Sequence, residues 1–330
     1  MKPVTAAARS ALAGAVRAGG KLLRLSIRAA GRFRGRRIVV FYVWPDFERK
    51  AEAIADLLRR RGFPAAVRSG DSRVQRVAIS ASRDLWIGFW NEYPTEYAPK
   101  NYIFYNAEQL SLPRWRDDPN WIHGLQNALE VWDYSDANES YLSRFGKQIR
   151  RVPFGYAPYY ESSYRANTVG KGLVEDIDVL FVGSLTERRR AVVDQLRALG
   201  LTVHLVSRES PAHGAQLDEL YARARIVLSI YQFADPGAQL ADYARLDHLL
   251  ANRRFVVQER PSSIGADPDL ERVITTCPYD QLADTCVRML TQPEERRKIA
   301  EVAYRWFKSE RALDATLPYD AVRGYLERLT

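Results

Sequence analysis

The sequence predicts an α/β fold of two doubly wound domains that face each other across a cleft. Two observations support this. Short apolar runs typical of buried strands alternate with helical stretches over residues 38–153, and the alternation restarts over residues 177–330. Such alternation indicates parallel sheets. The length of 330 residues also exceeds what one hydrophobic core usually supports, which favours two domains.

The first half opens with the apolar run Ile38–Val43, followed by a helical stretch, Phe47–Arg61. A continuous apolar run of this kind predicts a strand buried on both faces. We assign residues 38–157 to an N-terminal domain. Its further predicted strands are Val77–Ser80, Asp84–Phe89, Tyr102–Asn106, Val131–Tyr134 and Ile149–Pro153, and its further helices are Trp121–Leu129 and Asp136–Phe145.

A run rich in Gly, Pro, Tyr and Ser follows, which is typical of a connection between domains. We place a linker at residues 158–176, a C-terminal domain at 177–312, and a terminal helix at 313–330 that we expect to cross back to the first domain. The second set of predicted strands is Ile177–Val182, Thr202–Val206, Ile226–Ile230 and Phe255–Gln258. The predicted helices are Glu187–Leu199, Gln216–Arg223, Leu240–Ala251, Tyr279–Leu290, Glu294–Phe307 and Tyr319–Arg328.

The net charge of +9 is confined to one end of the chain. Residues 1–45 contain ten Lys and Arg and no Asp or Glu, and the rest of the chain has 39 basic and 40 acidic residues. Proteins that bind nucleic acid need basic residues along the folded surface, because phosphate contacts supply much of the affinity. The neutral body therefore argues against a nucleic-acid partner.

Residues 1–37 form a basic amphipathic segment, in which apolar and basic positions between Leu12 and Ala30 fall on different helical faces. Such a helix binds an anionic membrane surface. A frayed tail, favoured by its four glycines between residues 14 and 31, and an organellar transit peptide remain alternatives. No apolar run is long enough to span a membrane. We expect a cytoplasmic protein, peripheral on the inner membrane face.

The cysteines and histidines predict no metal site. Cys277 and Cys286 match neither a zinc-finger spacing nor a disulfide framework, and the four histidines are scattered. We expect both thiols to be reduced and buried.

The C-terminal half contains a predicted phosphate site, where a strand ends at Gly183-Ser184 before a helix that carries Arg188 and Arg189. Glycine allows the backbone to approach a phosphate closely, and free amides at a helix start favour an anion. The arginines would add charge-assisted contacts to a diphosphate. The alternative is an ordinary Gly-Ser turn with arginines that face water.

Three further residues are candidates in this half. Arg245 lies near a helix start, with Asp247 two residues later, and Glu259 follows a buried strand. An arginine there neutralises a leaving diphosphate, and carboxylates hold ribose or sugar hydroxyls. Ordinary surface positions are the alternative for Arg245 and Asp247. We interpret His248 as a packed side chain.

The N-terminal half offers two candidate general bases. Glu108 and Asp133 each lie near the carboxyl end of a predicted strand. An inverting transfer requires a group that takes the proton of the acceptor hydroxyl. A structural role is the alternative for both carboxylates.

The order of these motifs over residues 100–310 resembles bacterial GT-B glycosyltransferases, which have two Rossmann-like domains. Segments 106–109 and 131–135 look like those of a CgeB/YkvP-like branch and related surface-polysaccharide glycosyltransferases. The other motifs that carry the resemblance are Val152-Pro153-Phe154-Gly155-Tyr156, Val179–Ser184, Glu219-Leu220-Tyr221 with Ile226–Leu228, and Arg245-Leu246 with Leu250-Ala251-Asn252 and Val256-Val257.

This resemblance implies metal-independent transfer from a nucleotide-sugar co-substrate, without a further cofactor, to a glycan or lipid-linked acceptor. It places Glu108 or Asp133 at proton abstraction. The Glu-x7-Glu pattern of many retaining members is absent around Asp242, which favours inversion. The resemblance assigns Gly183, Ser184, Arg188 and Arg245 to donor phosphates and Asp247 and Glu259 to donor hydroxyls.

The leading hypothesis is a glycosyltransferase of surface polysaccharide or lipopolysaccharide biosynthesis. Two alternatives share the architecture. A nucleotide-sugar epimerase would bind the donor and need no acceptor, and an inactive glycan-binding protein would need no intact donor site.

Overall fold

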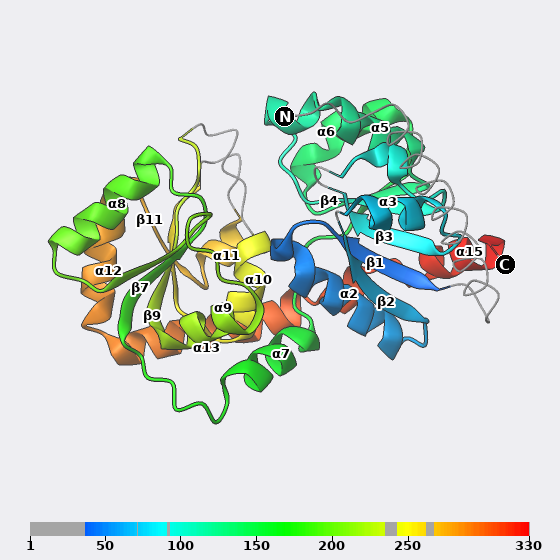
Figure 1. Cartoon of the computed structure of the whole chain (residues 1–330). Coiled ribbons are helices and arrows are strands. Elements are labelled where there is room, and N and C mark those ends of the chain that lie inside the picture. Colours follow the sequence, from blue (N-terminus) through cyan, green and yellow to red (C-terminus); the bar gives the residue numbers. More distant parts are fainter. Residues whose placement is uncertain (1–36, 71, 91–92, 235–242, 262–266, 330) are drawn as a thin grey trace, which may run out of the picture.

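The computed structural model describes residues 37–70, 72–90, 93–234, 243–261 and 267–329. Of the predicted basic segment, all but Arg37 lies outside these described residues. Figure 1 shows two domains side by side, each built around a twisted sheet with helices on its faces. The chain therefore has two parallel-sheet α/β domains, and the predicted fold class is confirmed.

The N-terminal domain contains a 6-stranded sheet of order β2-β1-β3-β4-β5-β6, with every neighbouring pair parallel. Strands β3 and β4 are buried along their whole length, as their apolar sequences predict. The strands are β1 (Ile38–Tyr42), β2 (Ala65–Ser69), β3 (Leu85–Phe89), β4 (Tyr102–Asn106), β5 (Glu130–Asp133) and β6 (Ile149–Arg151). The helices are α2 (Glu48–Arg60), α3 (Arg73–Ser80), α4 (Pro113–Arg116), α5 (Pro119–Asn127) and α6 (Glu139–Leu142), with 3-10 turns η1 (Pro45–Phe47), η2 (Thr95–Tyr97), η3 (Asp136–Asn138) and η4 (Ser143–Phe145).

The C-terminal domain repeats this strand order with one strand fewer. Its 5-stranded parallel sheet has the order β11-β10-β9-β7-β8. The strands are β7 (Ile177–Val182), β8 (Val203–Val206), β9 (Ala224–Ser229), β10 (Val256–Glu259) and β11 (Thr275–Cys277). The helices are α8 (Glu187–Ala198), α9 (Gly214–Arg223), α10 (Tyr243–Ala251), α11 (Pro268–Glu271), α12 (Leu282–Leu290) and α13 (Pro293–Glu310), with the 3-10 turn η6 (Tyr279–Gln281) before α12. Both cysteines are buried, as predicted.

One predicted strand is wrong. Val77–Ser80 belongs to the helix α3, which begins with a capping box in which Ser72 and Gln75 bond each other's backbone N–H. This pairing satisfies two amides that would otherwise lack partners at the helix start. The strand of this region is instead β2, whose side chains are half-buried or exposed at the sheet edge. An edge strand needs no apolar run, so β2 gave no hydrophobic signal.

Two crossings connect the domains. The predicted linker contains the helix α7 (Pro158–Thr168), which starts with proline at its first turn. The chain returns after α13 through α14 (Leu313–Thr316) and α15 (Tyr319–Leu329). The crossings lie side by side, because Tyr156 exchanges backbone hydrogen bonds with Arg311 (2.7 Å) and Leu313 (2.9 Å). A side chain at Gly155 would meet the Arg311 carbonyl at 2.3 Å, so this close approach requires glycine.

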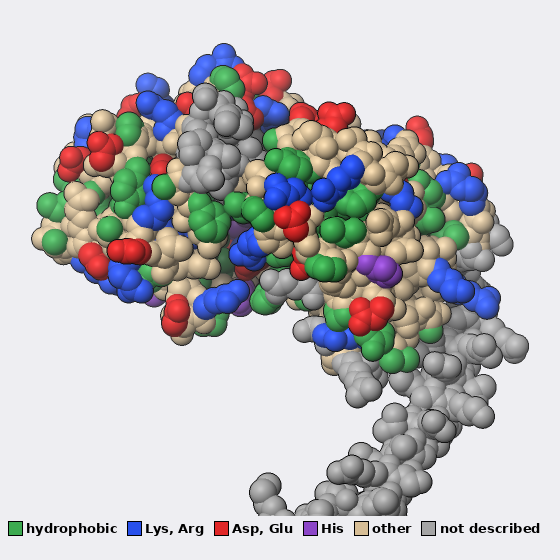
Figure 2. Space-filling view, turned by 90° about the horizontal axis from the view of Figure 1, so that it is seen from above, with side chains coloured by type: hydrophobic (Ala, Val, Ile, Leu, Met, Phe, Trp, Pro, Cys, Tyr) green, Lys and Arg blue, Asp and Glu red, His purple; other side chains and the backbone are tan. Residues whose placement is uncertain are grey.

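The helix α15 packs on the N-terminal domain, where Tyr325 donates a hydrogen bond of 2.9 Å to Oε2 of the buried Glu130. Lys and Arg are interspersed with Asp and Glu over both domains in the view of Figure 2, in line with a nearly neutral body. Within the described ranges, no helix is both long and apolar enough to cross a bilayer.

Candidate functional site

The strand order reverses direction at one place in each sheet. In the C-terminal sheet, β7 lies between β8 and β9. The chain passes from β7 to β8 on one side and then crosses to β9 on the other side. In doubly wound sheets, ligands bind at this switch point, outside the carboxyl ends of the strands. The ends that meet here are those of β7 at Val182, β9 at Ser229 and β10 at Glu259. Most of the predicted donor residues lie at or beside these ends.

Gly183 follows β7 at this edge, with a φ of 144°. Residues with a side chain rarely adopt that conformation. The position of a missing Cβ lies 3.6 Å from Nη2 of Arg245 and 3.6 Å from Nη1 of Arg189. The structure thus brings Gly183 and Arg245, which are 62 positions apart in the sequence, into one place. The absent side chain allows the guanidinium group of Arg245 to lie close to the backbone of the turn.

Arg189 is 3% exposed and donates to backbone carbonyls. Its Nε and Nη2 bond the carbonyl of Ile230 at 3.0 and 2.7 Å, and its Nη1 bonds that of Ser184 at 2.9 Å. The side chain therefore ties the turn after β7 to the end of β9. Sequence reasoning assigned Arg189 to a ligand, but the contacts observed serve to hold the switch point in shape.

Arg188 pairs with Glu259 through two short hydrogen bonds, of 2.8 Å from Nη1 and 2.7 Å from Nη2. The parallel geometry makes this a strong charge-assisted pair. Nη1 also donates to the Tyr231 carbonyl at 2.6 Å, and the Tyr231 amide donates to Glu259 at 2.9 Å. The Tyr279 ring lies under the guanidinium, 4.2 Å from its centre. The structure thus brings together Arg188 and Glu259, which the sequence analysis assigned separately to donor phosphates and donor hydroxyls, with two tyrosines that it missed.

Asp247 lies in a buried contact between the domains. It is 1% exposed, and its carboxylate accepts hydrogen bonds from Tyr160 (3.0 Å, Oδ2) and from the backbone of His248 (2.6 Å, Oδ1). Lys50 of the N-terminal domain places Nζ 3.2 Å from Oδ2. Asp247 is therefore not a surface position.

His248 is a packed residue, as the sequence interpretation holds. Its Nε2 lies 2.7 Å from Oδ1 of the fully buried Asp218. Burial lowers the pKa of the imidazole, and the hydrogen bond to Asp218 opposes this effect.

The side-chain amides of Asn106 and Asn138 connect the two candidate bases of the N-terminal domain, Glu108 and Asp133. Asp133 is 2% exposed and accepts from Asn106 at 2.6 Å, from Asn138 at 3.1 Å and from the Ser135 amide at 2.7 Å. Burial raises the pKa of Asp133 to about 7, although these donors oppose the shift. Asn106 and Asn138 also donate to the Glu108 carbonyl, at 3.0 and 2.9 Å. The side chain of Glu108 is half-buried and more accessible than that of Asp133.

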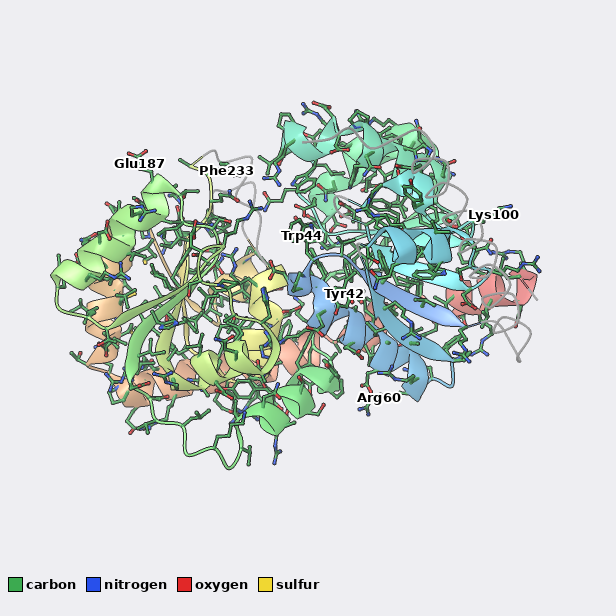
Figure 3. The ribbon with its side chains drawn as sticks, in the orientation of Figure 1. Tyr42, Trp44, Arg60, Lys100, Glu187 and Phe233 are labelled. Atoms are coloured by element: carbon green, nitrogen blue, oxygen red, sulfur yellow. The ribbon has the colours of Figure 1, made fainter. Side chains whose placement is uncertain are left out.

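Two exposed aromatic residues lie on opposite sides of the gap between the domain ribbons (Figure 3): Trp44 follows β1, and Phe233 follows β9. They are 39% and 36% exposed. Two grooves of the surface lie elsewhere. One of about 410 Å³ lies beside α7, and one of about 670 Å³ lies beside α15. Neither is lined by a predicted site residue. Among the described residues, no group of three or more His, Cys, Asp or Glu is arranged to hold a metal ion.

Comparison with known proteins supports the fold. No family model matches the chain. Two curated proteins of Acanthamoeba polyphaga mimivirus align with it: "Uncharacterized protein L140" is 24% identical over 200 residues, 58% of this chain and 60% of that protein, and "Uncharacterized protein L137" is 25% identical over 190 residues, 56% and 24%. The alignments thus span less than two thirds of either viral protein.

Several solved structures share the fold along nearly their whole length. WaaG, a glycosyltransferase involved in lipopolysaccharide biosynthesis, superposes with a TM-score of 0.52 at 14% identity, covering 89% of this chain and 99% of WaaG. AviGT4, a glycosyltransferase involved in avilamycin A biosynthesis, gives 0.51 at 14%, with 89% and 98% covered. Sucrose-phosphate synthase from Thermosynechococcus elongatus gives 0.50 at 12%, with 89% and 98%. The chain therefore has the two-domain fold of GT-B glycosyltransferases. The CgeB/YkvP-like branch stays a prediction.

Proposed function

We propose that the chain is a glycosyltransferase that binds a nucleotide-sugar donor at the switch point of its C-terminal sheet. The observation that carries this proposal is the approach of the Arg245 guanidinium to the Gly183 turn. A glycine turn gives a diphosphate access to backbone amides, and a cation beside it stabilises the charge that develops on the leaving group. The glycosyltransferases that share the fold support the same reaction class.

Within this proposal the two domains divide the work. Arg245 and the turn at Gly183 and Ser184 bind the diphosphate, and the pair of Arg188 with Glu259 lies beside this proposed donor site. The N-terminal domain binds a glycan or lipid-linked acceptor. Glu108 takes the proton of the attacking hydroxyl in an inverting, metal-independent transfer, because it is more accessible than Asp133.

We further propose a role in surface polysaccharide or lipopolysaccharide assembly on the cytoplasmic face of a membrane. The acid-free, basic start of the chain supports this placement, because basic amphipathic segments bind anionic lipid. Vesicle co-sedimentation of the full chain and of a variant that lacks residues 1–36 tests it. Equal sedimentation of both proteins with anionic vesicles contradicts membrane docking through this segment.

The donor proposal is tested by thermal unfolding with uridine, guanosine, cytidine and thymidine diphosphate sugars. A donor at 100 times its dissociation constant adds about 2.7 kcal/mol to the free energy of unfolding. We expect a clear rise in melting temperature with one nucleotide class. Product analysis then separates transfer from epimerisation. If no donor shifts the transition and none is hydrolysed, the proposed function is wrong.

A further inference from the structure

A buried ionic contact joins the two domains through helices α2 and α10. Lys50 of α2 reaches Asp247 of α10 with Nζ 3.2 Å from Oδ2 and 3.4 Å from Oδ1. The Tyr160 hydroxyl of the linker helix α7 bonds the same carboxylate at 3.0 Å. All three residues are at most 5% exposed. Salt screens such a contact much less than it screens a surface pair.

The preceding residue of α2 makes a second contact of the same kind. Arg49 donates from Nη2 to Asp218 and to the Gly214 carbonyl, both at 2.7 Å. Asp218 in turn lies 2.7 Å from His248 of α10. Lys50 thus contacts Asp247 of α10 directly, and Arg49 is connected to His248 of α10 through Asp218. Buried charges require their partners, so these contacts fix how α10 lies against the N-terminal domain.

The same helix carries Arg245 to the Gly183 turn. Residues two positions apart on an α-helix point about 200° away from each other. The guanidinium of Arg245 approaches Gly183, while the carboxylate of Asp247 meets Lys50 of the other domain. One helix is therefore held by the donor turn on one side and by the N-terminal domain on the other.

We propose that Lys50 is a positioning residue for the donor site: by pairing with Asp247 it fixes α10 and holds the Arg245 guanidinium against the Gly183 turn. This inference rests on the proposed function. Donor binding then depends on the contact between the domains, although Lys50 belongs to the domain that does not bind the donor. A displacement of about 1 Å in such a group costs up to roughly 100-fold in rate.

The test measures donor affinity by titration calorimetry with UDP-glucose, or with the nucleoside diphosphate sugar that the thermal screen selects. The variants are Lys50→Met and the double variant Lys50→Met with Asp247→Leu. The double variant removes both charges, so that no unpaired charge is buried if the single variant fails to fold. We expect about tenfold weaker binding in each folded variant.

The matched control is Arg61→Met. Arg61 directly follows α2 and pairs with Asp314 at 2.6 Å, and the two side chains are 53% and 40% exposed. Its loss should leave donor affinity unchanged. A general loosening of α2 would instead weaken donor binding in the control as well, and that result would overturn the proposal.

A double-mutant cycle shows whether Lys50 acts through Arg245. Arg245→Ala is introduced into the wild type and into the double variant. We expect it to weaken binding several-fold less in the double variant, since the guanidinium is already displaced there. Equal effects in both backgrounds, or wild-type affinity of the double variant, overturn the proposal. If the wild type itself binds no donor, the proposed function fails and this inference falls with it.

Discussion

The two sheets share one strand order, but the side chains at the carboxyl ends of their strands differ. In the C-terminal domain, a glycine turn and three arginines, Arg188, Arg189 and Arg245, gather at the switch point. The matching edge of the N-terminal domain holds the buried carboxylate of Asp133, enclosed by the amides of Asn106 and Asn138. The order of the strands therefore sets where a site can form, and the side chains that follow each strand decide what the site binds.

The three arginines of the C-terminal edge also differ in their surroundings. Arg188 and Arg189 are engaged with acceptors of the protein itself, namely Glu259 and the carbonyls of Ser184 and Ile230. Arg245 is half-buried and lies beside the glycine turn. We therefore expect single substitutions of these arginines to have different effects.

The largest expected effect is that of Arg188→Ala on stability. The substitution leaves Glu259, which is 4% exposed, without its cation. Breaking a buried pair in this way costs about 3–5 kcal/mol, measured as the free energy of unfolding in urea. The exposed neighbour Arg190 provides the control, and Arg190→Ala should change stability by less than ~0.5 kcal/mol. Equal costs for both substitutions would show that Arg188 has no special structural role.

The next effect concerns ligand binding. Arg245→Ala should weaken donor binding by about 1.5–3 kcal/mol, the range of a hydrogen bond to a charged group. Titration calorimetry with the donor measures it. Unchanged affinity would remove Arg245 from the phosphate site and leave the glycine turn without its proposed cation.

A third prediction contrasts the pH dependence of the two domains. The pKa of Asp133 is raised by burial from 3.8 to about 7, so the folded chain binds this proton more tightly than the unfolded chain. The stabilisation is complete below about pH 4 and is lost as the pH rises towards 7, by about 1.4 kcal/mol per pH unit. Urea unfolding of Asp133→Asn should show this slope removed. An unchanged slope would contradict the shifted pKa.

His248 acts in the opposite direction. Because burial lowers its pKa below the ordinary 6.5, the folded chain resists protonation of the imidazole. Its contribution to stability is present above about pH 6.5 and is lost on acidification below that value. His248→Gln should therefore reduce the loss of stability in acid. A steeper loss would show that Asp218 holds a charged imidazole.

The smallest effect is expected at the exposed rim between the domains. Nδ1 of His213 lies 3.8 Å from Oδ1 of Asp46, and these side chains are 44% and 82% exposed. Exposed pairs contribute little, so His213→Ala should change the free energy of unfolding by less than ~0.5 kcal/mol. A cost near that of Arg188→Ala would mean that rim contacts, and not the buried network of Lys50 and Asp247, hold the domains together.

Sequence reasoning located most elements because their apolar runs are local signals. Strands β4 and β7 match the predicted bounds fully, since β4 is buried along its whole length and β7 is mostly buried and apolar. It failed at β2 and α3, where an edge strand carries no apolar pattern and a capping box decides the helix. It also overlooked Tyr231, Tyr279 and Asn138. Their hydrogen-bond partners are Glu259, Arg188 and Glu108, which lie 28, 91 and 30 positions away in the sequence.

The sequence by itself determined two α/β domains, the glycine turn at Gly183 and the list of charged candidates, because strand burial and turn chemistry are written in short segments. Tertiary structure alone decided which charges meet. It paired Arg188 with Glu259, placed Asp247 against Lys50 of the other domain and brought Arg245 to Gly183. Charges act through distance in space, and strand order and domain contact set that distance.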